Sequence, residues 1–164
     1  INLILDPGMA FGTGSHPTTR LCLEWLEKQV QPGDKVLDYG CGSGILGIAA
    51  AKLGAGYVAG VDIDPQAVEA ARANAERNAV IARFEDSAEP LAGEYDLVVA
   101  NILSNPLRVL APAICAHVRQ GGKLALSGIL REQAEEIMAI YTPWVALNIA
   151  DIREDWVCLA GTRH

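Results

Sequence analysis

A glycine-rich run flanked by acidic residues is the part of this sequence best suited to chemistry. The run DYGCGSGILG occupies residues 38–47, and its glycines Gly42, Gly44 and Gly47 match the spacing of loops that bind dinucleotides. Asp62 follows Gly42 by 20 residues, where such proteins carry the acid that accepts hydrogen bonds from ribose hydroxyls. The spacing favours a nucleotide-containing cofactor over the alternative, a tight strand-to-helix turn that binds nothing.

The carboxylate that opens the run, Asp38, decides between cofactors. A dinucleotide loop presents backbone N–H groups and a helix N-terminus to a pyrophosphate, which a carboxylate aimed into the loop would repel. S-adenosylmethionine has no phosphate; its ammonium suits Asp38, its carboxylate suits the N-terminus of a helix from Ile45, and its ribose suits Asp62. The sequence therefore predicts S-adenosylmethionine. Two alternatives stay open: a nicotinamide cofactor, and an Asp38 that is buried and accepts hydrogen bonds from loop amides.

Strands that alternate with helices must position these groups. Apolar runs bounded by glycine or proline predict strands at 35–39, 57–62, 82–85, 95–100, 123–127, 144–149 and 156–161. Helical periodicity predicts helices that begin after Thr18 or Thr19 and after Asp64, and further helices at 45–53, 106–118 and 131–141. This order is typical of an α/β fold with a doubly wound, mostly parallel sheet of seven strands. The last two strands have no helix between them, so they must pair as an antiparallel hairpin at an edge.

Further candidates follow the third and fourth strands, because ligands in such sheets lie beyond the carboxyl ends of the strands. Asp86 and Ser87 suit the amino group of an adenine, the alternative being a solvated turn. Asn101 ends the fourth strand with a neutral amide, the alternative being a residue that only closes the turn. Ile63, directly after Asp62, is also assigned to the cofactor.

The composition excludes several classes of protein. The chain has 164 residues, of which 51% are hydrophobic and 20% charged, as in one globular domain. A net charge of −7 argues against tight unaided binding to nucleic acid. No apolar stretch is long enough for a membrane span, and the four cysteines are too scattered for a zinc site or a disulfide framework. We therefore expect a cytoplasmic protein with no metal site.

Several segments resemble one enzyme family. The runs VLDYGCGSG (36–44) and GVDIDPQAVEAARANAERN (60–78) are similar to the Rossmann-like class I methyltransferases that use S-adenosylmethionine. The narrower segments LDPGMAFGTGSHPTT (5–19), VVANIL (98–103) and LALSGIL (124–130) resemble the catalytic domain of the bacterial ribosomal protein L-eleven methyltransferases. The resemblance covers essentially the whole chain and implies methyl transfer to lysine and N-terminal amines of a ribosomal protein of the large subunit.

The resemblance also implies roles for individual residues. Thr19, Gly40, Asp62 and Asn101 match the cofactor-binding set of the family, and Phe11 lies in a loop expected to fold over the cofactor. We treat residues 1–164 as one methyltransferase domain whose segment 1–19 covers the cofactor, with 7–15 as a lid that orders on binding. The family's N-terminal domain, which recruits the ribosomal protein, is expected to be absent.

The expected chemistry needs an uncharged amine as the nucleophile. Lysine has a pKa near 10.4, and lowering it to ~7–8 costs roughly 3–4 kcal/mol, which desolvation can impose. The amide oxygen of Asn101 and the backbone carbonyl of Ile102 could hold the hydrogens of the amine without a full negative charge that would restore the ammonium. No dedicated general base is expected. Ile102 and Leu103 stand where methyltransferases of nucleobases carry two prolines, which argues against a nucleobase.

Two other functions stay open on the sequence alone. The same fold could methylate a small-molecule amine, or the domain could be a non-catalytic scaffold that binds S-adenosylmethionine. Methyl transfer to a ribosomal protein compared with small amines separates the first from the leading interpretation.

Overall fold

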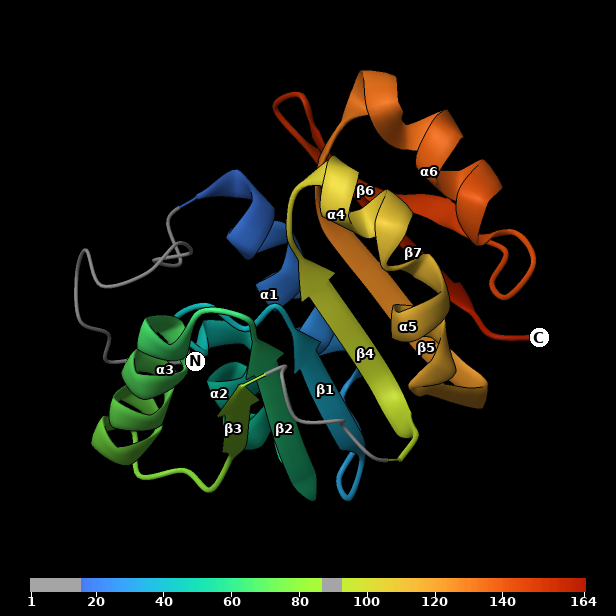
Figure 1. The fold of residues 1–164 in the computed structure, drawn as a ribbon. Helices are drawn as coiled ribbons and strands as arrows, with labels where there is room; N and C mark the ends of the chain where they lie inside the picture. The colour runs from blue at the N-terminus through green and yellow to red at the C-terminus, as the bar shows by residue number, and fades with distance from the viewer. Residues whose placement is uncertain (1–15, 87–92) are drawn as a thin grey trace.

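A seven-stranded sheet between two layers of helices forms the protein (Figure 1). The computed structural model describes residues 16–86 and 93–164. The strands are β1 (Lys35–Tyr39), β2 (Tyr57–Asp62), β3 (Arg83–Asp86), β4 (Tyr95–Asn101), β5 (Val118–Leu130), β6 (Asn148–Arg153) and β7 (Trp156–Thr162). The helices are α1 (Pro17–Gln29), α2 (Ile45–Lys52), α3 (Pro65–Arg77), α4 (Ser104–Val109), α5 (Ala111–Ala116) and α6 (Ala134–Tyr141), with a 3₁₀ turn at Arg131–Gln133.

The strand order is β3-β2-β1-β4-β5-β7-β6, and it confirms the predicted doubly wound sheet. The first five strands in this order are parallel, whereas β7 is antiparallel to both β5 and β6. The predicted hairpin of the last two strands is confirmed, with β6 at the edge and β7 inside it. The order reverses between β1 and β4, which places the switch point beside the glycine-rich turn.

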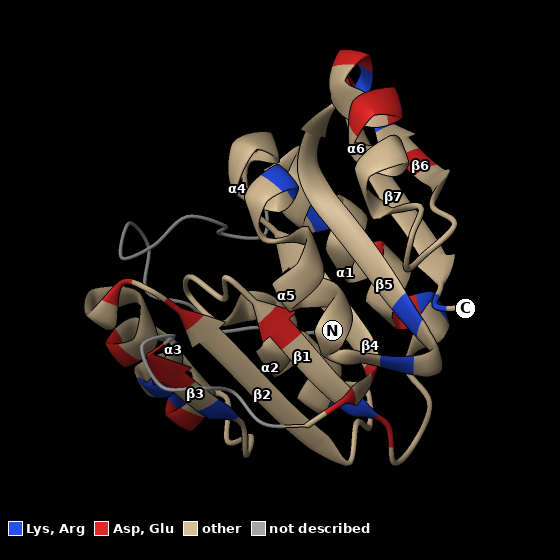
Figure 2. Cartoon of the chain, turned by 45° about the vertical axis from the view of Figure 1, so that its right-hand side comes forward, with Lys and Arg blue, Asp and Glu red and all other residues tan. Residues whose placement is uncertain are grey.

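Alternating side chains of the strands build the two halves of the core. Val36 and Val99 face the layer of α1 and α2, while Leu37 and Val98 face the layer of α4, α5 and α6. All four side chains are fully buried. In the view of Figure 2, charged residues lie mainly on helices, turns and strand ends, as expected for a sheet covered on both faces.

Several expected boundaries were wrong, and the strand expected at 123–127 is longer, spanning 118–130 as β5. The helix expected at 106–118 is two short helices that meet at Leu110, because Pro112 in the first turn of α5 has no N–H to continue the helix. The first helix begins at Pro17 with His16 as its N-cap, not at Thr18 or Thr19. The strand expected at 144–149 begins only at Asn148.

Among the described helices, none is long and apolar enough to cross a membrane. In the same ranges, 16–86 and 93–164, no group of three or more His, Cys, Asp or Glu residues could hold a metal ion.

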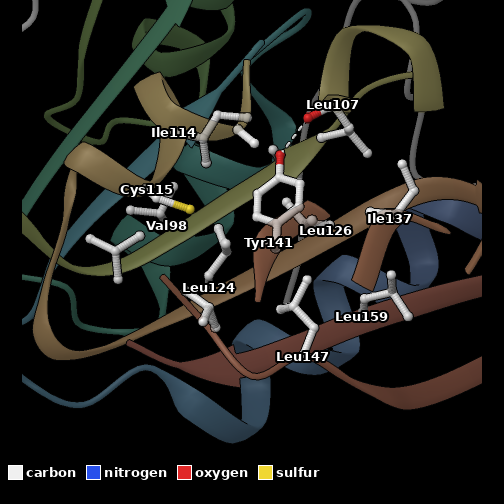
Figure 3. Close-up of a cluster of buried hydrophobic side chains, with 14 of the residues drawn as sticks. Val98, Leu107, Ile114, Cys115, Leu124, Leu126, Ile137, Tyr141, Leu147 and Leu159 are labelled. Atoms are coloured by element: carbon white, nitrogen blue, oxygen red, sulfur yellow. Dashed lines mark hydrogen bonds between the residues drawn. The ribbon is translucent and has the colours of Figure 1, made fainter. Parts of the chain in front are cut away.

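One buried hydrogen bond joins the helices of the second layer. The Tyr141 hydroxyl donates to the carbonyl oxygen of Leu107 at 2.7 Å, inside a cluster of aliphatic side chains (Figure 3). Tyr141→Phe removes this donor and leaves the buried carbonyl without it, so we expect the free energy of unfolding to fall by about 1–3 kcal/mol in urea denaturation. Tyr57→Phe is the control, because that side chain is 40% exposed. Equal losses for both variants would contradict the assignment.

Candidate functional site

The turn between β1 and α2 forms the floor of the site. Gly40, Gly42 and Gly44 all have positive φ, at 74°, 52° and 82°. The N–H groups of Gly40 and Cys41 both donate to the carbonyl oxygen of Val61 at 2.8 Å, which holds the turn against the end of β2. A Cβ at position 40 would lie 2.5 Å from Cγ2 of Ile102. Glycine is therefore required there for conformation and for space.

Asp62 joins the end of β2 to the glycine turn. Its two carboxylate oxygens accept the N–H groups of Gly42 and Asp64, each at 2.9 Å. A carboxylate has about four lone-pair sites, so two backbone bonds leave further acceptor capacity for hydroxyl groups. The two hydrogen bonds fix the carboxylate of Asp62 beside the glycine turn.

Asp38 is the most deeply buried acid of the site, with 1% of its surface exposed. Its Oδ2 accepts the N–H of Gly47 at 3.0 Å, an amide in the first turn of α2 and not in the loop before it. It also lines the cavity described below, and that position suits a cationic ligand. Burial raises the pKa of Asp38 to about 7; the Gly47 hydrogen bond opposes this rise, and the charge of Asp62 adds to it.

A cavity of about 400 Å³ opens at the carboxyl ends of β1, β2 and β4. One part is lined by the glycine turn and the strand-end acids. The other part is lined by the segment after β4, the start of α1, and single residues of β5 and β7, namely Asn101, Ile102, Leu103, His16, Gly128 and Trp156. The cavity therefore combines two carboxylates with many apolar side chains, which suits a ligand with a polar head beside a desolvated reacting group.

Asn101 lines the cavity from the tip of β4. Its Nδ2 donates to Oγ1 of Thr19 at 3.3 Å, while its Oδ1 is buried with no hydrogen-bond partner among the described residues. An unsatisfied buried acceptor costs roughly 1–3 kcal/mol, so a ligand that donates a hydrogen bond here regains that energy. Asn101 Oδ1 therefore lacks a hydrogen-bond donor at the place where an amine is expected.

The remaining predicted residues are placed as follows. Thr19 is fully buried behind Asn101 and is not among the residues that line the cavity. Asp86 ends β3 in register with Asp62 and likewise does not line it. Ile63 follows Asp62 directly and is 83% exposed. Phe11, Ser87 and the segment 7–15 lie outside the described residues.

Sequence reasoning missed Trp156 and Gly128 as cavity residues, and the structure places His16 in the lining together with them. The ring of Trp156 contacts the ring of His16 edge to face, with centroids 5.6 Å apart. The Nδ1 of His16 accepts the Thr18 N–H at 3.2 Å and so caps α1. Trp156 reaches the site only because β7 folds back beside β5, and no local pattern around it carries that information.

Gly128 supports the segment after β4. It has φ of +87°, and a Cβ there would collide with the carbonyl oxygen of Ile102, the atom expected to help hold an amine. Gly128→Ala should therefore displace this segment, lowering both stability and methyl transfer. Gly33→Ala is the matched control, with φ of +88° and nothing within 4 Å of the added Cβ. In the control, the strained backbone conformation alone should lower the free energy of unfolding by about 1–2 kcal/mol. Equal effects of the two variants on urea unfolding and activity would contradict a role for the contact.

Known proteins share this fold and much of this sequence. The family model for ribosomal protein L11 methyltransferase (PrmA) matches residues 1–164. A ribosomal protein L11 methyltransferase of Dechloromonas aromatica is 81% identical over 163 residues, covering 99% of this chain and 55% of the relative. One of Cupriavidus necator is 62% identical, with 98% of this chain and 54% of the relative covered. The chain thus spans about half the length of these curated relatives.

Solved structures agree with the sequence matches. The ribosomal protein L11 methylase of Lactobacillus delbrueckii superimposes with a TM-score of 0.88 at 35% identity, covering 97% of this chain and 83% of the other. A methyltransferase from Pyrococcus furiosus has a TM-score of 0.77 at 19% identity, over 99% of this chain and 88% of its own, and supports the fold alone. Because the family model matches all 164 residues of this chain, the chain belongs to the ribosomal protein L11 methyltransferase family.

Proposed function

We propose that this chain is the catalytic part of a cytoplasmic protein N-methyltransferase that transfers methyl groups to lysine or N-terminal amines of ribosomal protein L11. The observation that carries the proposal is the Oδ1 of Asn101, a residue that lines the cavity, because this atom is buried and has no hydrogen-bond partner among the described residues. An amine held beside Asn101 would donate to Oδ1 and lose its water to the apolar lining side chains.

The residues present fit S-adenosylmethionine as the cofactor. Asp38 would face the ammonium and Asp62 the ribose hydroxyls, while Gly40, Gly42 and Gly44 let the backbone approach the methionine part closely. Further residues complete the proposed cofactor set: Phe11, Thr19, Asn101, Asp86, Ser87 and Ile63, which lies beside Asp62. When bound, the cofactor supplies a methyl group on a positively charged sulfur, ready for displacement in line with the amine.

The chain's own contribution is to position and desolvate the amine. The apolar groups of Leu103 and Trp156 in the lining would displace water from an entering ammonium, which lowers its pKa and favours loss of its proton to water. Asn101 Oδ1 and the Ile102 carbonyl then accept the remaining N–H groups and direct the nitrogen lone pair away from themselves. Since both acceptors are neutral, neither restores the charge on the amine.

The lining residues argue against a dedicated general base. Both acids among them, Asp38 and Asp62, already accept backbone N–H groups, and the Nδ1 of His16 caps α1. Burial raises the pKa of the Cys41 thiol far above its usual range, so no thiolate forms near neutral pH. The net charge of −7 likewise favours a protein substrate over direct contact with nucleic acid.

The proposal is tested by following labelled methyl groups. The chain is incubated with methyl-labelled S-adenosylmethionine and large-subunit ribosomal proteins, both alone and fused to the part of the Dechloromonas aromatica relative that it does not match. Label on L11 supports the proposal. Label only on free lysine or other small amines would show a small-molecule enzyme. Bound cofactor with no transfer from either form would show a non-catalytic scaffold.

A further inference from the structure

The helices α4 and α5 are apolar on both of their sides. Their inner side is buried against the sheet and consists of Leu107, Ala111, Ile114 and Cys115. Their outer side is exposed, yet it too is mainly apolar. We call its apolar residues the outer band: Leu103, which precedes α4, and then Pro106, Val109, Pro112, Ala113 and Ala116. Because a helix that is apolar all round is normally covered on every side, the outer band is a surface that suits a further molecule.

Another surface helix of the chain lacks this pattern. The exposed side of α3 carries four charged residues, namely Glu69, Arg72, Glu76 and Arg77. In α4 and α5 the one charged residue is Arg108, and its guanidinium is bound to the Glu136 carboxylate of α6 at 2.9 Å. Val109 beside it is 77% exposed. The outer band is thus an uncharged surface, whereas an ordinary solvated helix face resembles that of α3.

The outer band begins at the cavity of the proposed site. Of the described residues that line the cavity, Leu103 and Pro106 alone are exposed, and all others are half-buried or buried. These two residues therefore mark where the cavity meets solvent. From there α4 and α5 run back from the carboxyl end of β4 along the sheet (Figure 1). A substrate chain whose amine enters past Leu103 has its neighbouring residues within reach of the outer band.

Charges next to the outer band favour a basic partner. Glu132, Glu135 and Glu136 are exposed at the start of α6, where Arg131 is the one base, and Figure 2 shows acidic residues on this helix. A protein that binds RNA carries basic side chains for the phosphates, so a ribosomal protein is complementary to these acids. A second copy of this chain, with a net charge of −7, would instead bring like charges together.

We propose that the outer band is a docking surface for the protein that carries the acceptor amine, and that it binds apolar side chains close to that amine in the substrate. This inference rests on the proposed function and adds a contact outside the cavity. Val109 and Ala113 do not line the cavity, so the contact acts on the affinity for the protein substrate and leaves the cofactor untouched.

The double variant Val109→Gln/Ala113→Gln tests the outer band. Both positions are exposed, so the variant should fold like the unsubstituted chain. Loaded with S-adenosylhomocysteine, it should bind ribosomal protein L11 about tenfold more weakly, because two apolar side chains lose their burial in the complex. The Kd for S-adenosylhomocysteine should stay within twofold. Ile81→Gln is the matched control, because Ile81 is 96% exposed and does not line the cavity.

Calorimetric titration measures these affinities, both for the chain alone and for the chain fused to the unmatched part of the Dechloromonas aromatica relative. An L11 affinity that stays within twofold in the double variant, or that falls equally in Ile81→Gln, overturns the inference. So does an unsubstituted chain that binds no L11 in either form. A dimer that the double variant loses in sedimentation, with L11 affinity unchanged, would assign the outer band to a second copy.

Binding without turnover separates this inference from the proposed function. Tenfold weaker L11 binding by the double variant, together with no methyl transfer by the unsubstituted chain, supports the docking surface and contradicts only the proposed function. Methyl transfer to L11 at equal affinity in both forms contradicts only the docking surface.

Discussion

Asn101→Ala is expected to lower methyl transfer about 100-fold while the affinity for S-adenosylhomocysteine changes little. The Oδ1 of Asn101 is buried and has no partner among the described residues, so in the proposed reaction it accepts a hydrogen bond from the amine. Losing that acceptor leaves the nitrogen free to move away from the line of attack, and a misplacement of about 1 Å can cost 10²-fold in rate. Initial rates at saturating cofactor and calorimetric titration measure the two quantities separately.

Two further variants test whether the effect is specific to the neutral amide of Asn101. Asn105→Ala is the matched control, because Asn105 is exposed on α4 and its Oδ1 binds Arg108 outside the cavity. Asn101→Asp keeps an acceptor but adds a negative charge, which stabilises the ammonium form of the substrate. Its activity should therefore be low near pH 7 and rise toward alkaline pH, where the amine is uncharged. A faster reaction at pH 7 would show that a base is needed, contrary to the proposed mechanism.

The parts of the fold that sequence predicted best are those set by local physics. The strands at 35–39 and 57–62 match β1 and β2 residue for residue, because each is a short apolar run ended by glycine or an acid. The N-cap of the first helix also has a local signal. Proline prefers the first position of a helix, so Pro17 makes His16 the cap. Pro112 carried the same kind of information about the break between α4 and α5.

The site residues likewise fall into those that local sequence predicts and those that long-range packing brings in. The contacts of Asp62 with the turn and of Asp38 with α2 lie within one strand–turn–helix–strand unit, and the spacing of the glycines and acids predicted that they would meet. Trp156 and Gly128 line the cavity from β7 and β5, and their approach depends on sheet order and on the register shift of the β5–β7 pairing between Leu126 and Ile129. Residue spacing does not encode such long-range packing, so one sequence alone could not assign them to the site.

Asp38→Asn is expected to stabilise the cofactor-free protein and, at the same time, to weaken cofactor binding. Burial raises the pKa of Asp38 from 3.8 to about 7, so the folded state holds this proton more tightly than the unfolded state. Stability from this group is thus fully present below about pH 4, is lost as pH rises toward 7, and stays lost above it. At pH 8 the penalty is at most about 4 kcal/mol at 1.36 kcal/mol per unit, and asparagine avoids it while still accepting the Gly47 N–H.

Urea unfolding at pH 8 and at pH 5 checks the first half of this prediction. Asp38→Asn should be more stable than the unsubstituted chain at pH 8, and the gain should shrink at pH 5, where the carboxyl is already protonated. Asp155→Asn, an exposed acid, is the control and should change neither value by more than a few tenths of a kcal/mol. A loss of stability at pH 8 would mean that the Asp38 charge serves the fold and not a ligand.

Calorimetry with S-adenosylhomocysteine checks the second half. The ammonium of that ligand favours the ionised form of Asp38, so binding near pH 6.5 should release a proton, and affinity should rise with pH until about pH 7 and then level off. Titrations in two buffers with different heats of ionisation measure the released proton directly. In Asp38→Asn the proton release should vanish and the affinity fall at least tenfold. Proton release that persists in the variant would assign the titration to another group and remove Asp38 from the cofactor site.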